Sequence, residues 1–506
     1  MEKIGRTAVL LLVVSLCMIL YVHKGSENNG PKSQKVLPPT ASSAGRVEEQ
    51  QPLAPYLNGR GHVCNVLDYG ARATGEDFDT HALQRAIDDC ATGDGGLVYV
   101  PPGDYLTATL YLRSNIVLYI EQNATIYGSP NQSDYPAEYS RWYVILADSV
   151  ENVEITGGGT VDGQAEKFVV RYDTRKNIMV SWNQTGDCKG DECRPRLLGF
   201  IDSRNIRVKD VFLHQPAYWC LHTVRCNHVV VEGVKIFGDF NIPNNDGIDI
   251  QDTNNTRIVN CRIDTGDDAI CPKTISGPLF NLTVSDSWIR TKSSAVKFGS
   301  DSRHDFHHLR FERLTIVDSH RGLALQLRDE GSISDVVFSD IVLSTRYYDP
   351  SWWGGAEPIY ITACPRGPST LVGSISDIQF INIVGTSENG VFLSGSPHSI
   401  LRRINLQNVT LSFVAAGRSD ITESYHDYRP GCQGLVSHNS SGIFVEYAKD
   451  VSFEDVTVNW ASNLDWDTPF EFTPKSVGRI SLSNVVSATF SSDFPFLTEK
   501  SGVASI

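Results

Sequence analysis

Apolar residues recur along this chain in a nine-residue pattern, at positions 1, 3, 6 and 8 of each copy; one copy reads Leu309-Phe311-Leu314-Ile316. Six strong copies begin at residues 206, 229, 256, 282, 309 and 336, so successive starts lie 23 to 27 residues apart. Weaker copies begin at residues 153, 378, 404, 451 and 480. Such constant spacing predicts a chain built from stacked structural units.

Each unit reads as two short strands that meet at a corner, because the apolar alternation breaks once between positions 3 and 6. Asn, Asp and Ser occupy the corner, where turns favour them. A unit of strands and turns alone cannot bury its apolar face, so neighbouring units must stack. We therefore predict an all-β fold, a single right-handed parallel β-helix. The chain lacks the signature of leucine-rich repeats, which excludes that fold. A β-propeller is excluded because it needs roughly forty residues per blade. An irregular β-sandwich does not explain the constant spacing.

An amphipathic segment at residues 80–90 precedes the repeats and predicts a helical cap over the open end of the solenoid. Four apolar residues share one face of this segment: Ala82, Leu83, Ala86 and Ile87. The segment 95–105 follows and is interpreted as the first strand and turn of the β-helix.

Three aspartates fall at matching positions of two adjacent units. The segment 246–250 aligns with 268–272, which places Asp246 beside Asp268, and Asp267 directly precedes Asp268. Repulsion between clustered carboxylates raises the proton affinity of one of them, while another stays ionised as a base. Hydrolysis of a glycosidic bond needs that division of labour. An isolated pair of aspartates after a glycine would instead suggest a turn or a calcium ligand.

Much of residues 62–490 resembles the polygalacturonase-type glycoside hydrolases of family 28. The resemblance is most specific at residues 244–250, which look like the family's Asn-x-Asp-Gly element and include Asn244, and at residues 265–270, which look like its Asp-Asp element. It implies that Asp267 is the general acid and that Asp246 and Asp268 hold and activate water, with inversion of the anomeric configuration. It also implies that no metal and no other cofactor takes part.

Two elements of that family differ in this chain. Ser294 stands where the family's Gly-His-Gly element has its histidine, and Ala324 and Gln326 replace the arginine and lysine that clasp a galacturonate carboxylate. Losing both cations costs several kcal/mol, since each charge-assisted hydrogen bond contributes about 1.5–3 kcal/mol. Either other cations substitute for them, or the sugar bound there is not a uronate. Asn244, Ser294 and Gln326 remain candidate substrate-binding residues.

Lys297 is the first candidate for a substitute cation, because its place in the repeat matches that of Ala324 in the next unit. Lys273, Arg321 and Arg328 are further candidates. Each of these side chains is equally well explained as a solvated surface cation.

An insertion at residues 347–366 interrupts the repeat, because 42 residues rather than 27 separate the starts at 336 and 378. It carries Tyr347, Tyr348, Trp352, Trp353 and Glu357. Aromatic rings in a long loop on a rigid scaffold are suited to sugar recognition, so we take Trp352, Trp353 and Glu357 as candidate substrate contacts. The alternative is a hydrophobic brace.

The N-terminus predicts entry into the secretory pathway. Fifteen uncharged residues, 8–22, follow two basic ones, which suits a signal peptide and is short for a bilayer span of ~20 residues. We expect residues 1–24 to be either a cleaved signal peptide or a single membrane anchor, residues 25–61 to be a flexible polar linker, and residues 62–500 to form the β-helix. The protein would then be secreted or membrane-anchored.

Cysteines and sequons agree with an oxidising compartment. Ten of the eleven cysteines lie outside the leader, an even number that permits full pairing. Cys188 with Cys193, and Cys220 with Cys226, are close enough in sequence to form loop disulfides. A zinc site is the weaker interpretation, because the cysteines are scattered and form no Cys-x-x-Cys pair. Seven Asn-x-Ser/Thr sequons are present.

The function predicted from these observations is inverting hydrolysis of O-glycosidic bonds in a polysaccharide, pectin or a related glycan, by a monomeric chain. A formal charge of −15 argues against nucleic acid as a partner. Two alternatives stay open: a β-helix polysaccharide lyase or epimerase, and a non-catalytic glycan-binding protein at the cell surface.

Overall fold

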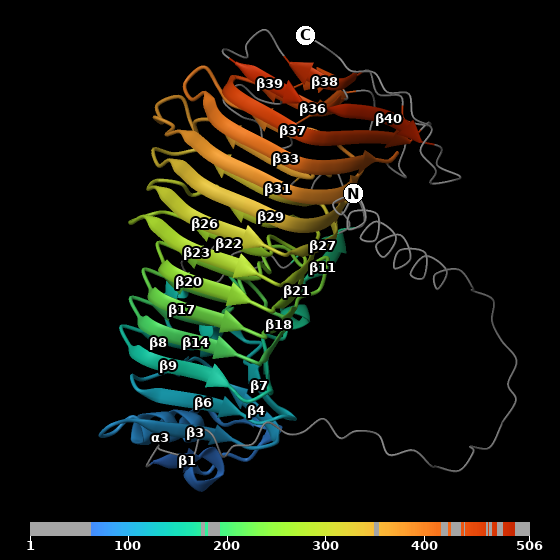
Figure 1. Cartoon of the computed structure of the whole chain (residues 1–506). Coiled ribbons are helices and arrows are strands. Elements are labelled where there is room, and N and C mark those ends of the chain that lie inside the picture. The colour runs from blue at the N-terminus through green and yellow to red at the C-terminus, as the bar shows by residue number, and fades with distance from the viewer. Residues whose placement is uncertain are drawn as a thin grey trace, which may run out of the picture. The chain divides into compact units, whose positions relative to one another are not determined.

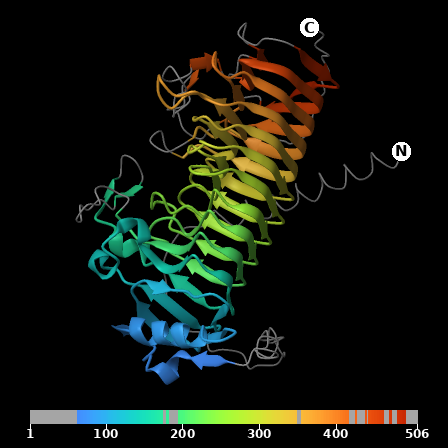
Figure 2. The same ribbon diagram turned by 90° about the vertical axis from the view of Figure 1, so that its left-hand side faces the viewer.

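The computed structural model describes residues 62–173, 178–180, 193–348, 354–415, 424–426, 437–439, 441–461, 464, 468–472 and 479–490. In this part of the chain parallel strands stack coil upon coil along one axis, from α3 and β1 at the N-terminal end to β39 and β40 (Figure 1). The side view shows the same regular stack, with loops projecting from one side (Figure 2). The predicted right-handed parallel β-helix is confirmed.

The described strands form one sheet of 24 strands and one of 12, here called sheet A and sheet B. Most coils contribute two strands to sheet A, on either side of a corner, and one strand to sheet B. The first strands of the coils in sheet A are β1 (Val63–Asn65), β3 (Gly96–Val100), β6 (Ile116–Ile120), β9 (Glu151–Thr156), β14 (Arg204–Lys209), β17 (Asn227–Glu232), β20 (Asn254–Val259), β23 (Leu279–Ser285), β26 (Phe306–Glu312) and β39 (Ile480–Ser483).

The second strands in sheet A are β2 (Thr74–Phe78), β4 (Gly103–Thr107), β7 (Ala124–Gly128), β10 (Thr160–Asp162), β15 (Phe212–His214), β18 (Lys235–Phe237), β21 (Arg262–Thr265), β24 (Trp288–Thr291), β27 (Thr315–Ser319) and β40 (Val486–Phe490). In four later coils one long strand crosses the corner: β29 (Ile333–Thr345), β31 (Ile375–Ser387), β33 (Leu401–Phe413) and β37 (Ala448–Ala461).

Sheet B is the third face of each coil. Its strands are β5 (Leu110–Tyr111), β8 (Tyr143–Asp148), β13 (Arg196–Ile201), β16 (Leu221–Val224), β19 (Ile248–Gln251), β22 (Ile270–Lys273), β25 (Ser294–Phe298), β28 (Arg321–Leu327), β30 (Ile359–Ala363), β32 (Val391–Ser394), β36 (Ser441–Glu446) and β38 (Thr468–Phe472). Two antiparallel hairpins lie outside the coils: β11 (Arg171–Asp173) with β12 (Ile178–Val180), and β34 (Ser424–His426) with β35 (Ser437–Asn439).

The hydrophobic repeat sets the register of sheet A. Ile206 pairs with Val229, Val229 with Thr256, and Thr256 with Leu282. The same register continues through Leu309 and Val336. The weaker copies at 153, 378, 404, 451 and 480 pair in the same way. Each predicted start therefore lies directly above or below the next, as stacked coils require.

Polar residues at the corners adopt the left-handed conformation that turns the chain. Asp210, Asn260 and Asp286 have φ values of 53°, 54° and 53°. Asn and Asp tolerate this conformation better than other side chains with a Cβ. Corner side chains also bond along the axis, for example from Asn408 Nδ2 to Asn382 Oδ1 at 2.7 Å. The corners therefore stabilise both the bend of each coil and the contact between coils.

The interior of the coils is a continuous apolar core, because positions 1, 3, 6 and 8 of each repeat point inward. At equivalent positions of neighbouring coils, side chains of the same kind stack on one another. The rings of Phe311 and Phe338 lie 4.9 Å apart between centroids, and those of Phe338 and Phe380 lie 5.1 Å apart with an interplanar angle of 5°. All three side chains are completely buried.

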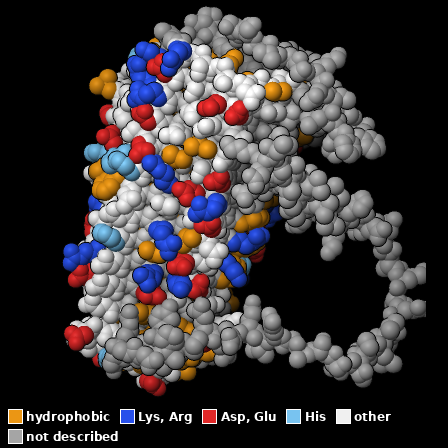
Figure 3. All heavy atoms as spheres, in the orientation of Figure 1, with side chains coloured by type: hydrophobic (Ala, Val, Ile, Leu, Met, Phe, Trp, Pro, Cys, Tyr) orange, Lys and Arg blue, Asp and Glu red, His pale blue; other side chains and the backbone are white. Residues whose placement is uncertain are grey.

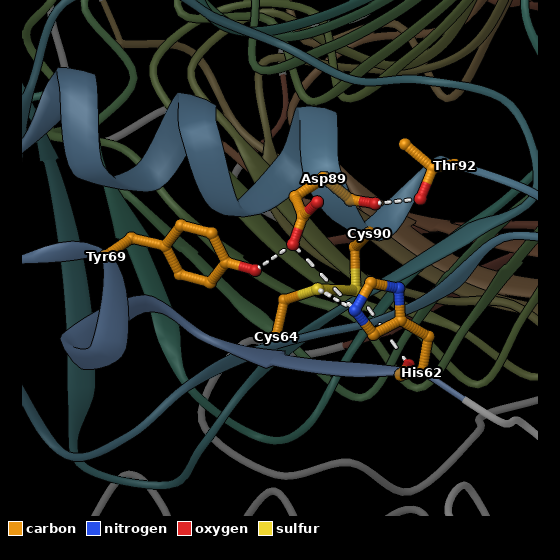
Figure 4. The surroundings of a disulfide bond; sticks show 6 residues. All are labelled: His62, Cys64, Tyr69, Asp89, Cys90 and Thr92. Carbon is orange, nitrogen blue, oxygen red and sulfur yellow. Dashed lines mark hydrogen bonds and ion pairs between the residues drawn. A yellow bond between two sulfur atoms is a disulfide. The ribbon is translucent and has the colours of Figure 1, made fainter.

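The predicted cap is helix α3 (Thr80–Cys90), which buries Ala82, Leu83, Ala86 and Ile87 against the first coil. A disulfide between Cys64 and Cys90 ties the end of the helix to β1 (Figure 4). Short 3-10 turns occur at η1 (Val66–Tyr69), η2 (Gln132–Asp134), η3 (Tyr139–Arg141) and η4 (Ala165–Phe168). One expectation is corrected here: β1 and β2 precede the segment 95–105, so that segment is not the first strand.

The cysteine prediction was only partly right. Cys193 and Cys364 are also disulfide-bonded, but Cys220 and Cys226 are buried free thiols. Strand β16 runs between Cys220 and Cys226, and an extended strand of four residues holds their Cα atoms well beyond the ~7 Å that a disulfide can bridge. Cys261 and Cys271 are buried thiols as well. Cys188 lies outside the described residues.

Charged side chains of both signs are interspersed on the outer face of sheet A (Figure 3). Many pair between adjacent coils: Arg225 with Asp202, Arg313 with Asp286, and Arg403 with Asp377. In the described part of the chain no helix is long and apolar enough to cross a membrane. The predicted leader (1–24) and linker (25–61) lie outside the described residues.

Replacing Phe338 by alanine removes one ring from the middle of the internal stack. We expect Phe338→Ala to lower the free energy of unfolding by about 3–5 kcal/mol, since the rigid neighbouring coils cannot collapse into the space. Val337 points to the outer face of the same strand, so Val337→Ala should cost less than about 1 kcal/mol. Urea denaturation followed by circular dichroism measures both. Equal losses for the two variants would contradict this account of the core.

Candidate active site

Strands β19 and β22 bring the predicted aspartates together. Ile248 pairs with Ile270, so Asp246 and Asp268, each two residues before its strand partner, occupy equal positions in adjacent coils. The Gly247 N–H donates to the Asp268 carbonyl at 2.9 Å. A Cβ on Gly247 would lie 2.4 Å from the Ala269 carbonyl oxygen, so only glycine permits this close approach. The predicted register between the two coils is confirmed.

The three carboxylates form one buried cluster. Asp246, Asp267 and Asp268 each place a carboxylate oxygen within 4.8 Å of the others. Their residues are only 4%, 3% and 2% exposed. At such separations in a poorly solvated site the three groups cannot all carry a full negative charge without compensation.

Asp267 is held by backbone donors. The N–H groups of Asn244 and Asp268 each donate to its carboxylate at 2.9 Å. Asn245 fixes the surrounding loop, because its Oδ1 accepts from the N–H groups of Gly266 and Asp267 at 2.8 and 3.0 Å. Burial, together with the charge of Asp268, raises the pKa of Asp267 to about 6. Asp267 therefore holds a proton in mildly acidic solution.

Asp268 is placed in the opposite environment. Its Oδ2 accepts from the Lys297 ammonium, and its Oδ1 accepts from the Ser293 hydroxyl at 2.7 Å and the Ser294 N–H at 3.1 Å. Burial by itself raises the pKa of Asp268, but the charge and hydrogen bond of Lys297 outweigh it, so the pKa lies below its usual value. Asp268 is thus the carboxylate that stays ionised.

Asp246 completes the cluster on the side of the preceding coil. Burial and the neighbouring Asp249 and Asp267 raise its pKa well above the usual value, against the opposing charge of Lys273. Lys273 Nζ lies 3.8 Å from its Oδ2. Its Oδ1 is buried and accepts no hydrogen bond from a described residue. A hydroxyl group of water or of a substrate is the natural donor to that oxygen.

Neither lysine of the predicted set is a solvated surface cation. Lys273 is 6% exposed, donates to Asp249 and lies 2.8 Å from Cys271 Sγ. The side chain of Lys297 is 14% exposed and pairs with Asp268. Both ammonium groups therefore neutralise the acid cluster from within, on neighbouring coils.

The remaining predicted residues lie along the next coils. Ser294 is buried, pairs in register with Arg321, and its hydroxyl has no described partner. Arg321 binds Glu357 through two hydrogen bonds of 3.0 and 3.2 Å, and its guanidinium stacks 3.6 Å from the centroid of the Tyr360 ring. Gln326 is 4% exposed. Arg321 and Glu357, both predicted to contact substrate, therefore form a buried ion pair with each other.

Asn244 lies partly exposed beside Asp267, and its side-chain oxygen accepts from Arg194 at 3.3 Å. Arg328 follows β28 and is half-buried. Trp352 and Trp353 lie outside the described residues.

The beginning of the insertion folds down onto the coils. Tyr347 and Tyr348 make edge contacts with His320 at centroid distances of 5.3 and 5.8 Å. Tyr348 also meets the Phe240 ring at 5.1 Å and donates its hydroxyl to the Asp318 carbonyl. For these two tyrosines the brace is the better description, because their rings pack against protein.

Three described groups of side chains have the spacing of a metal site, and two of them involve the acids. The oxygens of Asp246, Asp267 and Asp268 would suit a divalent cation by distance alone. However, Lys297 and Lys273 already supply the positive charge that such an ion would bring. In the third group, His62 approaches Cys64 and Cys90, whose sulfurs form a disulfide and are not thiolate ligands (Figure 4).

Several residues of the site were missed by the sequence interpretation. Arg194 is 1% exposed and donates to the carbonyls of Ala217 and Pro243 at 2.6 and 2.8 Å, which holds the loop before Asn244. Arg196 and Trp219 occupy the positions of Asp246 in the two preceding coils. Alignment of the repeats would have identified Arg196 and Trp219 as the residues at the position of Asp246 in the two preceding coils. Arg194 has no such signal, because its contacts join separate loops.

A family model described as glycosyl hydrolases family 28 matches residues 90–433 of this chain. The chain is 24% identical over 315 residues to a probable polygalacturonase of Vitis vinifera, covering 56% of this chain and 62% of that protein. It is 29% identical over 251 residues to an exo-poly-alpha-D-galacturonosidase of Dickeya chrysanthemi, covering 41% of each. The chain thus spans less than two thirds of the length of these two relatives.

Among solved structures, a family 28 exopolygalacturonase of Yersinia enterocolitica superimposes with a TM-score of 0.60 at 19% identity, covering 84% of this chain and 78% of that one. At this identity the likeness concerns the fold. Together with the matching family model, it confirms the resemblance noted in the sequence.

Removing the Lys297 ammonium tests how the site keeps Asp268 ionised. In Lys297→Met the pKa of Asp268 should rise, because burial and the nearby carboxylates then act without the compensating cation. The acid limb of the pH profile of kcat/KM should therefore move to higher pH. Lys235→Met, at an exposed position of β18, should leave the profile in place. An unmoved acid limb in Lys297→Met would show that Asp268 is not the titrating base.

Proposed function

Because the chain belongs to glycosyl hydrolase family 28, we propose that it hydrolyses O-glycosidic bonds of a polysaccharide, pectin or a related glycan, with inversion at the anomeric carbon. The observation that carries the proposal is the opposite tuning of two adjacent carboxyl groups. The pKa of Asp267 is raised to about 6, whereas that of Asp268 is lowered beside Lys297. A protonated acid and an ionised base side by side are what this hydrolysis needs.

In the proposed reaction Asp267 donates its proton to the glycosidic oxygen as the bond from that oxygen to the anomeric carbon breaks. A water molecule held by Asp246 and Asp268 attacks the anomeric carbon, and Asp268 accepts its proton. The ionised Asp268 accepts one hydrogen of that water, and Asp246 Oδ1, which has no described hydrogen-bond partner, forms the second hydrogen bond to it. Lys297 stabilises Asp268 before the proton arrives.

The short distance between the carboxyl groups suggests an alternative outcome, retention of the anomeric configuration. Carboxylates of inverting enzymes are commonly about 6.5–9.5 Å apart and those of retaining enzymes about 5–5.5 Å apart, whereas these oxygens lie within 4.8 Å. Asp268 acting alone as a nucleophile would explain such a distance. One observation favours water instead: Asp246 sits beside Asp268, and its Oδ1 has no described hydrogen-bond partner, so the two carboxyl groups can hold a water molecule between them.

The proposed substrate is a polygalacturonan or a related glycan, because the two relatives above carry polygalacturonase-type names. Ala324 and Gln326 are buried and offer no positive charge, so the position at which the family clasps a galacturonate is neutral here.

We propose a monomeric chain without a metal or nucleic acid partner. A secreted or membrane-anchored location is proposed from the leader, and the Cys64–Cys90 disulfide supports it.

Replacing the proposed acid should stop turnover but not recognition. We expect Asp267→Asn to lower kcat by about 10²–10⁴-fold, since a positioned general acid contributes that much, and to keep glycan binding measurable by calorimetry. Asp340→Asn is the matched control, because Asp340 is an exposed corner residue and the following coil carries Asn382 at the same position. Turnover that survives Asp267→Asn would exclude Asp267 as the acid. Binding without any hydrolysis by the unaltered chain would favour a glycan-binding protein.

The first product formed reveals the stereochemistry. Proton NMR of the fresh digest should show the anomer opposite to that of the cleaved bond, because water attacks directly. The same anomer would instead establish a covalent intermediate on an aspartate. Ultraviolet absorbance from an unsaturated sugar, together with a requirement for calcium, would identify a lyase and end the hydrolase proposal.

A further inference from the structure

One column of residues on the outer face of sheet B leads away from the acids toward the N-terminus. Leu198 pairs with Leu221, and Leu221 pairs with Ile248. Two residues before these partners stand Arg196, Trp219 and Asp246, at equal positions in three successive coils. Coils are spaced by roughly 4.8 Å, so Arg196 lies roughly 10 Å along the axis from the acid cluster.

Three aromatic rings hold the Arg196 guanidinium. Its central carbon lies 5.4 Å from the centroid of Tyr143, 5.0 Å from that of Tyr218 and 5.1 Å from that of Trp219. These contacts fix the position of the cation but use none of its N–H donors. The rings thus preorganise a positive charge without neutralising it.

Arg196 differs in this respect from four other cations near the acids. Arg194, Arg321, Lys273 and Lys297 are each engaged by carbonyls or carboxylates. The Arg196 guanidinium forms no hydrogen bond or ion pair with any residue in the described ranges, and its Nε is buried without a partner. The side chain as a whole is only partly buried. A half-buried cation with unused donors is completed by an anionic ligand.

The opposite side of the acid cluster is filled with protein. The column that continues from Lys297 toward the C-terminus consists of Ala324, Tyr360, Phe392 and Phe444, which are at most 3% exposed. Their rings stack on one another at centroid distances of 5.5 and 5.2 Å. A glycan that reaches the acids is therefore accommodated on the N-terminal side, where Arg196 and Trp219 are partly exposed.

We infer that Arg196 binds the anionic group of an acidic sugar unit on the N-terminal side of Asp246, which rests on the proposed hydrolysis of a polysaccharide at that site. The ligand chemistry is an oxyanion on a pyranose ring, either the carboxylate of a uronate or a sulfate ester. The planar fork of the guanidinium suits both, through two parallel N–H donors. The anion-binding cation thus lies on the N-terminal side of the acids. On the C-terminal side Ala324 and Gln326 carry no charge, and Arg321 is paired with Glu357.

The kinetic test compares two substrates that differ only in charge: oligogalacturonides and the same oligosaccharides with reduced carboxyl groups. In Arg196→Gln the ratio of kcat/KM for the acidic over the neutral substrate should fall by about 10- to 100-fold, the range expected for a lost charge-assisted hydrogen bond. Arg196→Lys should restore part of it, because it keeps the charge but not the fork. Arg207→Gln, at an exposed position of β14 on sheet A, is the matched control and should leave the ratio unchanged.

A binding test separates this inference from the proposed reaction. Calorimetry with the Asp267→Asn chain measures binding of oligogalacturonides and of sulfated galactan oligosaccharides, with and without Arg196→Gln. Affinity for one of the two acidic glycans that falls at least about tenfold in Arg196→Gln supports the inference and identifies the anion as carboxylate or sulfate. Such a loss without hydrolysis by the unaltered chain would refute only the proposed function. Hydrolysis with an unchanged charge preference in Arg196→Gln, or no binding of either acidic glycan, would overturn the inference.

Discussion

The parallel register between coils is the constraint on which the rest of this structure depends. Once the inward side chains at residue 206 and its counterparts stack, every other position of a coil lies above its equivalent in the next. The same ladder that aligns apolar side chains inside the solenoid aligns Asp246 with Asp268 outside it. Core and site are therefore not independent: a slip of one residue would move the apolar set outward and separate the acids as well.

Burial of charge is the second feature that shapes the site. Three carboxylates lie at the surface of the coils yet are almost inaccessible to water, and two lysines from neighbouring strands compensate them. The compensation is uneven, because Lys297 bonds directly to Asp268 whereas Asp267 receives only backbone donors. Uneven compensation turns three chemically identical side chains into groups with different proton affinities. The difference arises from position rather than from residue type.

The two sides of the acid cluster are unlike each other. Toward the C-terminus the outer face of sheet B is covered, with Arg321 closed onto Glu357 and aromatic rings stacked beyond it. Toward the N-terminus Arg196 and Trp219 remain partly exposed. The backbone of sheet B repeats from coil to coil, so it is the side chains and insertions on each coil that decide where a glycan can lie. The direction in which a glycan can lie is thus decided locally, coil by coil.

The amino-acid sequence by itself determined the coils, the cap helix and the meeting of Asp246 with Asp268, because all three follow from periodic spacing along one chain. It did not predict that Cys220 and Cys226 stay unpaired, since only the extended course of β16 keeps them apart. Nor did it reveal the roles of Arg194, Lys297 and Arg196. Whether a cation is pinned by carbonyls, paired with a carboxylate or held by rings depends on which loops and coils surround it, and that is decided by tertiary structure alone.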